Sequence, residues 1–270
     1  AVHIVYGNQG ELSYITDSKV YLGLLTGSYI PVEEWWNTKE FINFINEIFS
    51  DKTVLVNIFD WDPISNNKIE PILDLIEHRR DSIEIEVTTS VARMIDSAVV
   101  HRLKEFSNIG FNVIVNGIGT KNDYLQYPTN WSTVEANIDT LLASIPNPKT
   151  KLYHPLCHAS VYTLPDIVEW CKEKKLFVNV ELANNIDCLD FNSVPEDDLN
   201  KLGDYINSVD DPRNRLKPQL KSQIISYIQR TWFYLNRYRE FRNYVDRIDK
   251  IRGTDWNSIF LPTRSEEHTS

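Results

Sequence analysis

The sequence predicts an α/β protein built as a partial parallel (βα) barrel with a helical C-terminal extension. Short runs of β-branched and aromatic residues alternate with longer amphipathic runs, which is the pattern of βα units around a parallel sheet. The pattern changes after residue 195, where a long helical stretch follows. A chain of 270 residues with 42% hydrophobic residues is long enough to bury one sizeable core.

The expected elements follow in chain order. The alternating run "AVHIVY" opens the chain, and four further strands are expected over residues 53–59, 82–87, 111–117 and 175–182. Helical spacing of apolar residues predicts helices over 37–49, 66–80, 96–110 and 131–145, several of them with Asn, Asp or Thr at the start as caps. One long helical pattern rich in arginine and aromatic residues covers 216–253 and stops at Gly253.

These elements give a domain organisation of residues 1–194 as the barrel and 195–263 as the helical layer. Residues 264–270, "RSEEHTS", resemble the translation of a common sequencing adapter, and we expect them to be a non-native tail. Ala1 already lies in the first alternating run, so we expect the natural chain to begin upstream.

Composition limits the classes of partner. The net charge of −10 and the pI near 5.1 disfavour nucleic acid and anionic membrane surfaces. No apolar run reaches the roughly 20 residues that a membrane span needs. No basic segment followed by a short apolar stretch resembles a signal peptide, so we expect a cytoplasmic protein. The three cysteines, Cys157, Cys171 and Cys188, are expected to be buried, reduced thiols.

Four segments carry a family resemblance. The most specific is "NGIGTKNDYLQYPTNWSTVEANIDTLL" over 116–142. The others are "WWNTKEFINFINEIFSDKTVLVNIFDWDP" over 35–63, "SVYTLPDIVEWCKEKKL" over 160–176 and "YVDRIDKIRGTDWNSIFLP" over 244–262. In residue type and spacing they resemble the radical S-adenosylmethionine (AdoMet) proteins that carry a twitch-type auxiliary domain. The resemblance covers nearly the whole chain and implies a barrel of radical-SAM type, S-adenosylmethionine and a [4Fe-4S] cluster.

The cluster ligands are missing from this chain. In the family, an Asn after the first strand precedes three cysteines whose thiolates hold the cluster. Here Asn8 is present, but the cysteine positions are Gly10, Tyr14 and Asp17. Other family motifs are also changed. The Gly-Gly-Glu-Pro positions are Asp60, Trp61, Asp62 and Pro63. An Asn-Thr-Asn-like strand end is replaced by Thr88–Ser90, and a polar Ser-X-Asp-Gly strand end is replaced by Ile114–Gly117. The resemblance therefore implies a cluster-less member, with an iron-sulfur site only in degenerate form.

A ligand is expected at the carboxyl ends of the parallel strands, where α/β folds place their sites. The candidate binding residues there are Asn8, Asp60, Asp62, Thr88, Ser90, Asn116 and Gly117, with Tyr124 and Tyr127 from the following loop. Trp61 and the two tyrosines could stack on a planar group such as adenine. The set lacks strong nucleophiles and bases, so the sequence indicates recognition rather than turnover and names no catalytic residue.

Three function classes remain open. The first is a non-catalytic protein that binds a nucleotide-like ligand such as S-adenosylmethionine, a peptide or a partner protein. The second is a fragment of an active radical enzyme whose Cys-X3-Cys-X2-Cys segment lies upstream; only then would a [4Fe-4S] cluster be a cofactor. The third is metal-dependent or acid/base chemistry at the barrel rim by Asp60, Asp62 and His154.

Two further features could be functional or purely structural. His154, Cys157 and His158 are metal-ligand types, but on an extended segment Cys157 would point away from the two histidines. The stretch from Tyr227 to Arg247 interleaves arginines with aromatic residues and could dock a peptide or nucleic acid. An amphipathic helix with aromatic residues in the core and arginines in water is the favoured interpretation.

Overall fold

The computed structural model describes residues 2–5, 20–22, 39, 43, 55–59, 62–64, 69–145, 148–182, 189, 191–209, 218–230 and 234–261. The chain divides into two compact units. Unit 1 comprises residues 1–114 and 132–151, and unit 2 comprises residues 115–131 and 152–270. None of the described helices is long and apolar enough to cross a bilayer.

Unit 1 is built on a parallel sheet. Five of its strands are β1 (Val2–Val5), β2 (Val20–Leu22), β3 (Leu55–Phe59), β4 (Glu84–Thr89) and β5 (Asn108–Ile114). They lie in the order β2-β1-β3-β4-β5, and every neighbouring pair is parallel. The predicted adjacency of the three strands near 53–59, 82–87 and 111–117 is confirmed, as is the α/β barrel-type class.

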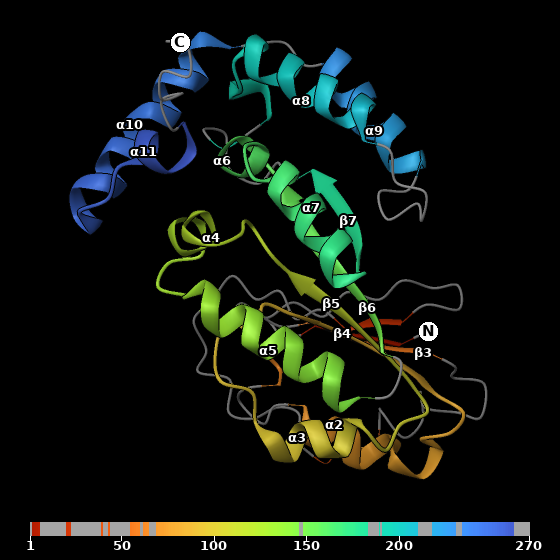
Figure 1. Cartoon of the computed structure of the whole chain (residues 1–270). Helices are drawn as coiled ribbons and strands as arrows, with labels where there is room; N and C mark the ends of the chain where they lie inside the picture. The colour runs from red at the N-terminus through yellow and green to blue at the C-terminus, as the bar shows by residue number, and fades with distance from the viewer. Residues whose placement is uncertain are drawn as a thin grey trace. The chain divides into compact units, whose positions relative to one another are not determined.

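Helices α2 (Glu70–Ile76), α3 (Ser97–Leu103) and α5 (Trp131–Ser144) lie on one side of this sheet (Figure 1), and the short 3-10 helix η2 (Glu77–Arg79) follows α2. Their apolar faces and the alternate residues of the strands form the core; Ile58, Ile72 and Phe111 are fully buried. Burial of apolar surface is the main stabilising contribution to such a layer. The predicted cap of α3 is present, because the Asp96 carboxylate accepts a hydrogen bond from the Ala98 amide at 2.8 Å.

Strand β6 (Lys149–Leu156) begins in unit 1 and ends in unit 2. Unit 2 continues with α6 (His158–Val161), α7 (Leu164–Lys174) and β7 (Phe177–Leu182), and it includes the earlier helix α4 (Thr120–Leu125). Its remaining elements are helical: η4 (Phe191–Ser193), α8 (Glu196–Ser208), α9 (Pro218–Arg230), α10 (Leu235–Arg252) and α11 (Trp256–Phe260). The expected boundary between residues 194 and 195 lies inside unit 2 and stays a prediction.

Two expected boundaries were wrong. The strand placed at 111–117 occupies Asn108–Ile114, and the helix placed at 96–110 ends at Leu103. The strand ends early because the chain turns at Gly117 into α4; a Cβ at Gly117 would meet the Asn122 nitrogen at 3.0 Å. The long helical pattern over 216–253 contains the helices α9 and α10, in agreement with the expected C-terminal helices.

The segment "HPLCHAS" is not extended throughout. Strand β6 ends at Leu156, Cys157 caps the next helix, and His158 lies in α6. The strand gives way there because the Cys157 amide donates to the Ser160 hydroxyl at 3.0 Å, while the amide of Val161 donates to the Cys157 carbonyl. Cys157 therefore lies at a strand-to-helix junction and is half-buried rather than buried as expected, while Cys171 is buried in α7. Cys188 lies outside the described residues.

Candidate functional site

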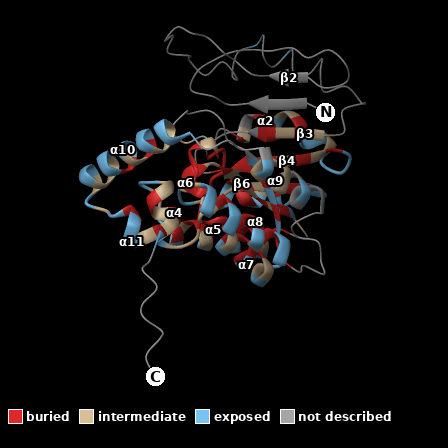
Figure 2. Ribbon diagram, turned by 90° about the horizontal axis from the view of Figure 1, so that it is seen from above, coloured by how far each residue is buried: buried red, intermediate tan, exposed pale blue. Residues whose placement is uncertain are grey.

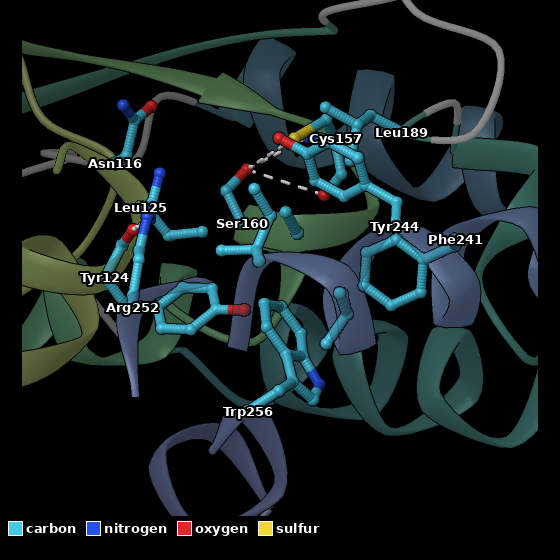
Figure 3. A pocket seen from close by; sticks show the side chains of 13 residues that line it. Asn116, Tyr124, Leu125, Cys157, Ser160, Leu189, Phe241, Tyr244, Arg252 and Trp256 are labelled. Carbon is cyan, nitrogen blue, oxygen red and sulfur yellow. Dashed lines mark hydrogen bonds between the residues drawn. The ribbon is translucent and has the colours of Figure 1, made fainter. Parts of the chain in front are cut away.

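A pocket of about 190 Å³ lies wholly within unit 2 (Figure 3). It is formed by polar groups at one end and by aromatic and aliphatic side chains elsewhere. The lining residues are Asn116, Tyr124, Leu125, Cys157, Ala159, Ser160, Leu189, Phe241, Tyr244, Val245, Ile248, Arg252 and Trp256.

The pocket lies at strand ends, as expected for an α/β fold. Asn116 follows β5 in the chain and Cys157 follows β6, so both come directly after the carboxyl end of a strand. Tyr124 and Leu125 are contributed by α4. Loops and helix starts that follow parallel strands are where this architecture builds its binding sites.

Helix α10 supplies one wall. Phe241, Tyr244, Val245, Ile248 and Arg252 line the pocket and recur at intervals of three or four residues, so they share one face of the helix. The opposite side of α10 carries exposed residues (Figure 2). The helix is amphipathic, but the expected burial of its aromatic residues holds only for Phe241 among those described, because Tyr234 and Tyr244 are exposed.

Aromatic rings close the base of the pocket. Trp256 is 2% exposed, and its ring meets those of Tyr124 and Phe241 edge-on at centroid distances of 5.5 and 5.3 Å. It also stacks on Phe260 at 3.8 Å. Edge-to-face pairs of this kind contribute about 0.5–1.5 kcal/mol beyond their buried area. The rings therefore form a preorganised apolar wall.

The corner between α10 and α11 fixes Arg252 and Trp256. Helix α10 ends at Gly253 with φ +67°, a conformation that suits glycine. Asp249 then holds the corner, because its two carboxylate oxygens accept hydrogen bonds from the Thr254 hydroxyl at 2.8 Å and the Trp256 amide at 2.9 Å. This corner is the "DKIRGTDW" part of the closing segment.

Arg252 is the charged group of the pocket. Its Nη1 donates a hydrogen bond to the Tyr124 carbonyl at 2.8 Å. Its guanidinium lies over the rings of Tyr127 and Tyr124, at 4.4 and 5.8 Å from their centroids. These contacts hold the cation against α4 and the turn that follows it.

The hydroxyl and thiol of the pocket are held by local contacts. The Ser160 hydroxyl donates to the Pro155 carbonyl at 2.6 Å and accepts from the Cys157 amide. The Cys157 sulfur lies 3.5 Å from the same hydroxyl. Ser160 is thus engaged in the capping box of α6. The buried His154 ring lies beside the Ser160 backbone.

Two described histidines of unit 2, His154 and His158, are buried and neutral. His154 Nδ1 bonds to the Val115 carbonyl at 2.9 Å, and burial lowers its pKa to about 4. His158 Nδ1 bonds to the Ser193 hydroxyl at 2.6 Å, and its ring stacks on Phe241 at 3.5 Å. Burial, together with the positive charge of Arg242, lowers the pKa of His158 to about 3. The histidines have separate partners rather than a shared ligand.

The sequence-predicted site residues fall into both units. Asn116 and Tyr124 line the pocket of unit 2. Gly117 precedes α4, and Tyr127 lies outside the pocket, 61% exposed under the Arg252 guanidinium.

In unit 1, Asp62, Thr88 and Ser90 are buried. The Asp62 carboxylate accepts hydrogen bonds from the Ser90 hydroxyl at 3.3 Å and the Ala92 amide at 3.2 Å, which makes it a support for the loop after β4. Asn8, Asp60 and Trp61 lie outside the described residues, as do Gly10, Tyr14 and Asp17.

The described residues do not fit a [4Fe-4S] cluster. Three thiolates are needed, and in the described part of the chain the free cysteines are Cys157 beside the pocket and the fully buried Cys171. A search of that same part finds no group of three or more His, Cys, Asp or Glu residues placed to hold a metal ion.

Several residues that line the pocket were not predicted from the sequence as site residues, and the most important of these are Arg252 and Trp256. Both lie in the closing segment that carries part of the family resemblance. The sequence signal was the Gly253 helix stop flanked by Arg252 and the cap residue Asp255, because such a corner fixes the side chains on either side of it.

Comparison with known proteins identifies the fold. No family model and no curated protein matches the chain. The chain is similar to a solved structure described as "Native anSMEcpe with bound AdoMet", with a TM-score of 0.50 and 12% identity, over 76% of this chain and 59% of that one. The fold is that of the radical SAM enzymes.

Two further structures of the same protein match at 11% identity. They are described as bound to AdoMet with the peptides Cp18Cys and Kp18Cys, and their TM-scores are 0.49 and 0.48. They cover 75% and 76% of this chain and 57% and 59% of their own. The chain thus spans about three-fifths of the length of the structures it matches.

Proposed function

We propose that this chain is a cluster-less, non-catalytic protein of the radical-SAM fold that recognises a ligand through one planar or apolar group held in the pocket of unit 2. The observation that carries the proposal is the composition of the pocket: aromatic rings, aliphatic side chains and a single guanidinium meet at the carboxyl ends of strands. Apolar pockets with few convergent polar groups are the common form of ligand sites.

The chemistry of the lining residues supports recognition over turnover. A nucleophile needs an adjacent base, but the Ser160 hydroxyl donates to the Pro155 carbonyl, and burial, which lowers the pKa of His154 to about 4 and that of His158 to about 3, makes both histidines weak bases. The sequence also has no cysteine at positions 10, 14 and 17. These features favour the first of the three function classes.

The size of the pocket bears on the kind of ligand. Pockets for drug-sized molecules measure about 300–1,000 Å³, whereas this one measures about 190 Å³. It has room for one ring system, such as the adenine of a nucleotide-like ligand or one side chain of a peptide. The neighbouring structures are described with AdoMet and peptides, which makes both versions worth testing.

A pocket-filling substitution tests the proposal. Ala159 lines the pocket, so Ala159→Leu is expected to weaken binding about ten-fold or more by occupying the space of the ligand. The probes are adenine for the nucleotide-like version and indole for the side-chain version, each followed by ligand-observed NMR. Ala143→Leu, at an exposed alanine of α5, is the matched control and is expected to leave binding unchanged.

The outcomes separate the versions. Binding of adenine alone supports a nucleotide-like ligand, and binding of indole alone supports a peptide or protein side chain. If neither probe binds the unaltered chain, or if Ala159→Leu and Ala143→Leu behave alike, the pocket is not the recognition site. Thermal unfolding of both variants checks that each is folded.

A further inference from the structure

We infer that the pocket of unit 2 selects a small carboxylate attached to a single aromatic or similarly sized apolar ring. The inference rests on the proposed function and names the chemical class of its ligand. Three independent features lead to it: an uncompensated cation, a buried hydroxyl directed into the space, and the volume enclosed by the aromatic wall.

The cation is Arg252, the one charged residue among those that line the pocket. One of its nitrogens is used by the Tyr124 carbonyl. Within the described part of the chain the structure gives it no ion pair, although the chain as a whole carries a net charge of −10. A guanidinium has five N–H donors in a planar fork that matches a carboxylate. An anionic ligand would complete the pairing of this cation.

The hydroxyl is that of Tyr124, whose side chain is 8% exposed. Among the described residues its oxygen has no hydrogen-bond partner of normal geometry, and Figure 3 shows it pointing into the pocket. Burial raises the pKa of Tyr124, as does the Asp249 carboxylate within hydrogen-bonding reach of this hydroxyl, so the group keeps its proton. The hydroxyl can turn this one proton from Asp249 toward an acceptor beside Arg252.

The Asp249 carboxylate neighbours the Tyr124 hydroxyl, but its main contacts lie elsewhere. It is not a lining residue, and both of its oxygens accept hydrogen bonds from the corner between α10 and α11. Its role is to position Trp256 and to keep Tyr124 protonated.

The volume of the pocket limits the size of the apolar part of the ligand. An apolar cavity of about 150 Å³ accommodates benzene, so about 190 Å³ admits one six-membered ring with a short acidic substituent. The rings of Phe241 and Trp256 supply the apolar contact. The same chemistry occurs in a free aromatic acid and in an aromatic residue at the C-terminus of a peptide.

The test compares two probes that differ in charge and little in shape, phenylacetate and phenylacetamide, by calorimetry on the full chain. Charge-assisted hydrogen bonds exceed neutral ones by about 1 kcal/mol or more, so phenylacetate is expected to bind about ten-fold tighter. Arg252→Gln should remove this preference, and Arg252→Lys, which retains the charge, should keep part of it. N-acetylphenylalanine represents the peptide source: tighter binding than phenylacetate favours a peptide, and weaker binding favours a free acid.

Two further variants keep the test independent of folding. Tyr124→Phe removes only the hydroxyl and is expected to weaken phenylacetate about five-fold. Arg239→Gln, at an exposed arginine of the same helix, should leave both probes unaffected. Equal binding of phenylacetate and phenylacetamide would overturn the inference while leaving the pocket as a recognition site. Failure of these probes together with adenine and indole would overturn both.

Discussion

Replacing Trp256 by alanine is expected to lower the free energy of unfolding by about 3–5 kcal/mol, the range for deleting a large buried aromatic side chain. Trp256 is the common partner of four rings, so its loss leaves an apolar void bordered by Tyr124, Tyr162, Phe241 and Phe260. Urea unfolding followed by circular dichroism measures the effect.

The control for this substitution is Tyr234→Ala, at the start of α10, where the side chain is 51% exposed. We expect it to change stability by well under half as much, because little buried surface is lost. A Trp256→Ala variant as stable as Tyr234→Ala would show that the aromatic wall of the pocket is not packed as described.

Acidification is expected to destabilise the chain between about pH 6.5 and pH 4. An unfolded histidine titrates near 6.5, whereas burial lowers the pKa of folded His154 to about 4 and that of His158 to about 3. As the pH falls through this window, the histidines bind protons in the unfolded state but not in the folded state. Each histidine therefore costs about 3 kcal/mol of stability by pH 4.

The pH dependence of unfolding in His154→Asn and His158→Asn tests this prediction, since asparagine keeps a polar group near the Nδ1 position without titrating. Both variants should show a shallower loss of stability than the unaltered chain between pH 6.5 and 4. His101→Asn, at an exposed histidine of α3, should keep the original slope. An unchanged slope in the first two variants would mean that these histidines are not the groups that resist protonation.

Local signals explain what the sequence predicted well. The start of α3 at the Asp96 cap and the end of α10 at Gly253 were predicted because each depends on one residue with a special backbone role. Strand β5 was misplaced by three residues because Asn and Gly, which are rare in strands, occur near both ends of 108–117, and pairing with β4 rather than composition sets where the strand begins.

The pocket could be predicted only in part. Asn116 was expected because it follows a strand, and Tyr124 because it belongs to the most specific family-like segment. Arg252 and Trp256 were not, because their proximity to α4 depends on packing across more than half of the sequence. No pattern within α10 indicates which distant helix its apolar face will meet.

The measurement that tests the central proposal most directly is the amount of iron and acid-labile sulfide bound per chain after anaerobic reconstitution. The protein used is the longest form that the gene encodes. The reconstituted protein is then incubated with S-adenosylmethionine and a reductant. The account predicts far less than one [4Fe-4S] cluster per chain, because three thiolates are needed and positions 10, 14 and 17 supply none, and it predicts no cleavage of S-adenosylmethionine. A stoichiometric cluster with formation of 5′-deoxyadenosine would contradict it and would favour an active radical enzyme whose cysteines lie upstream.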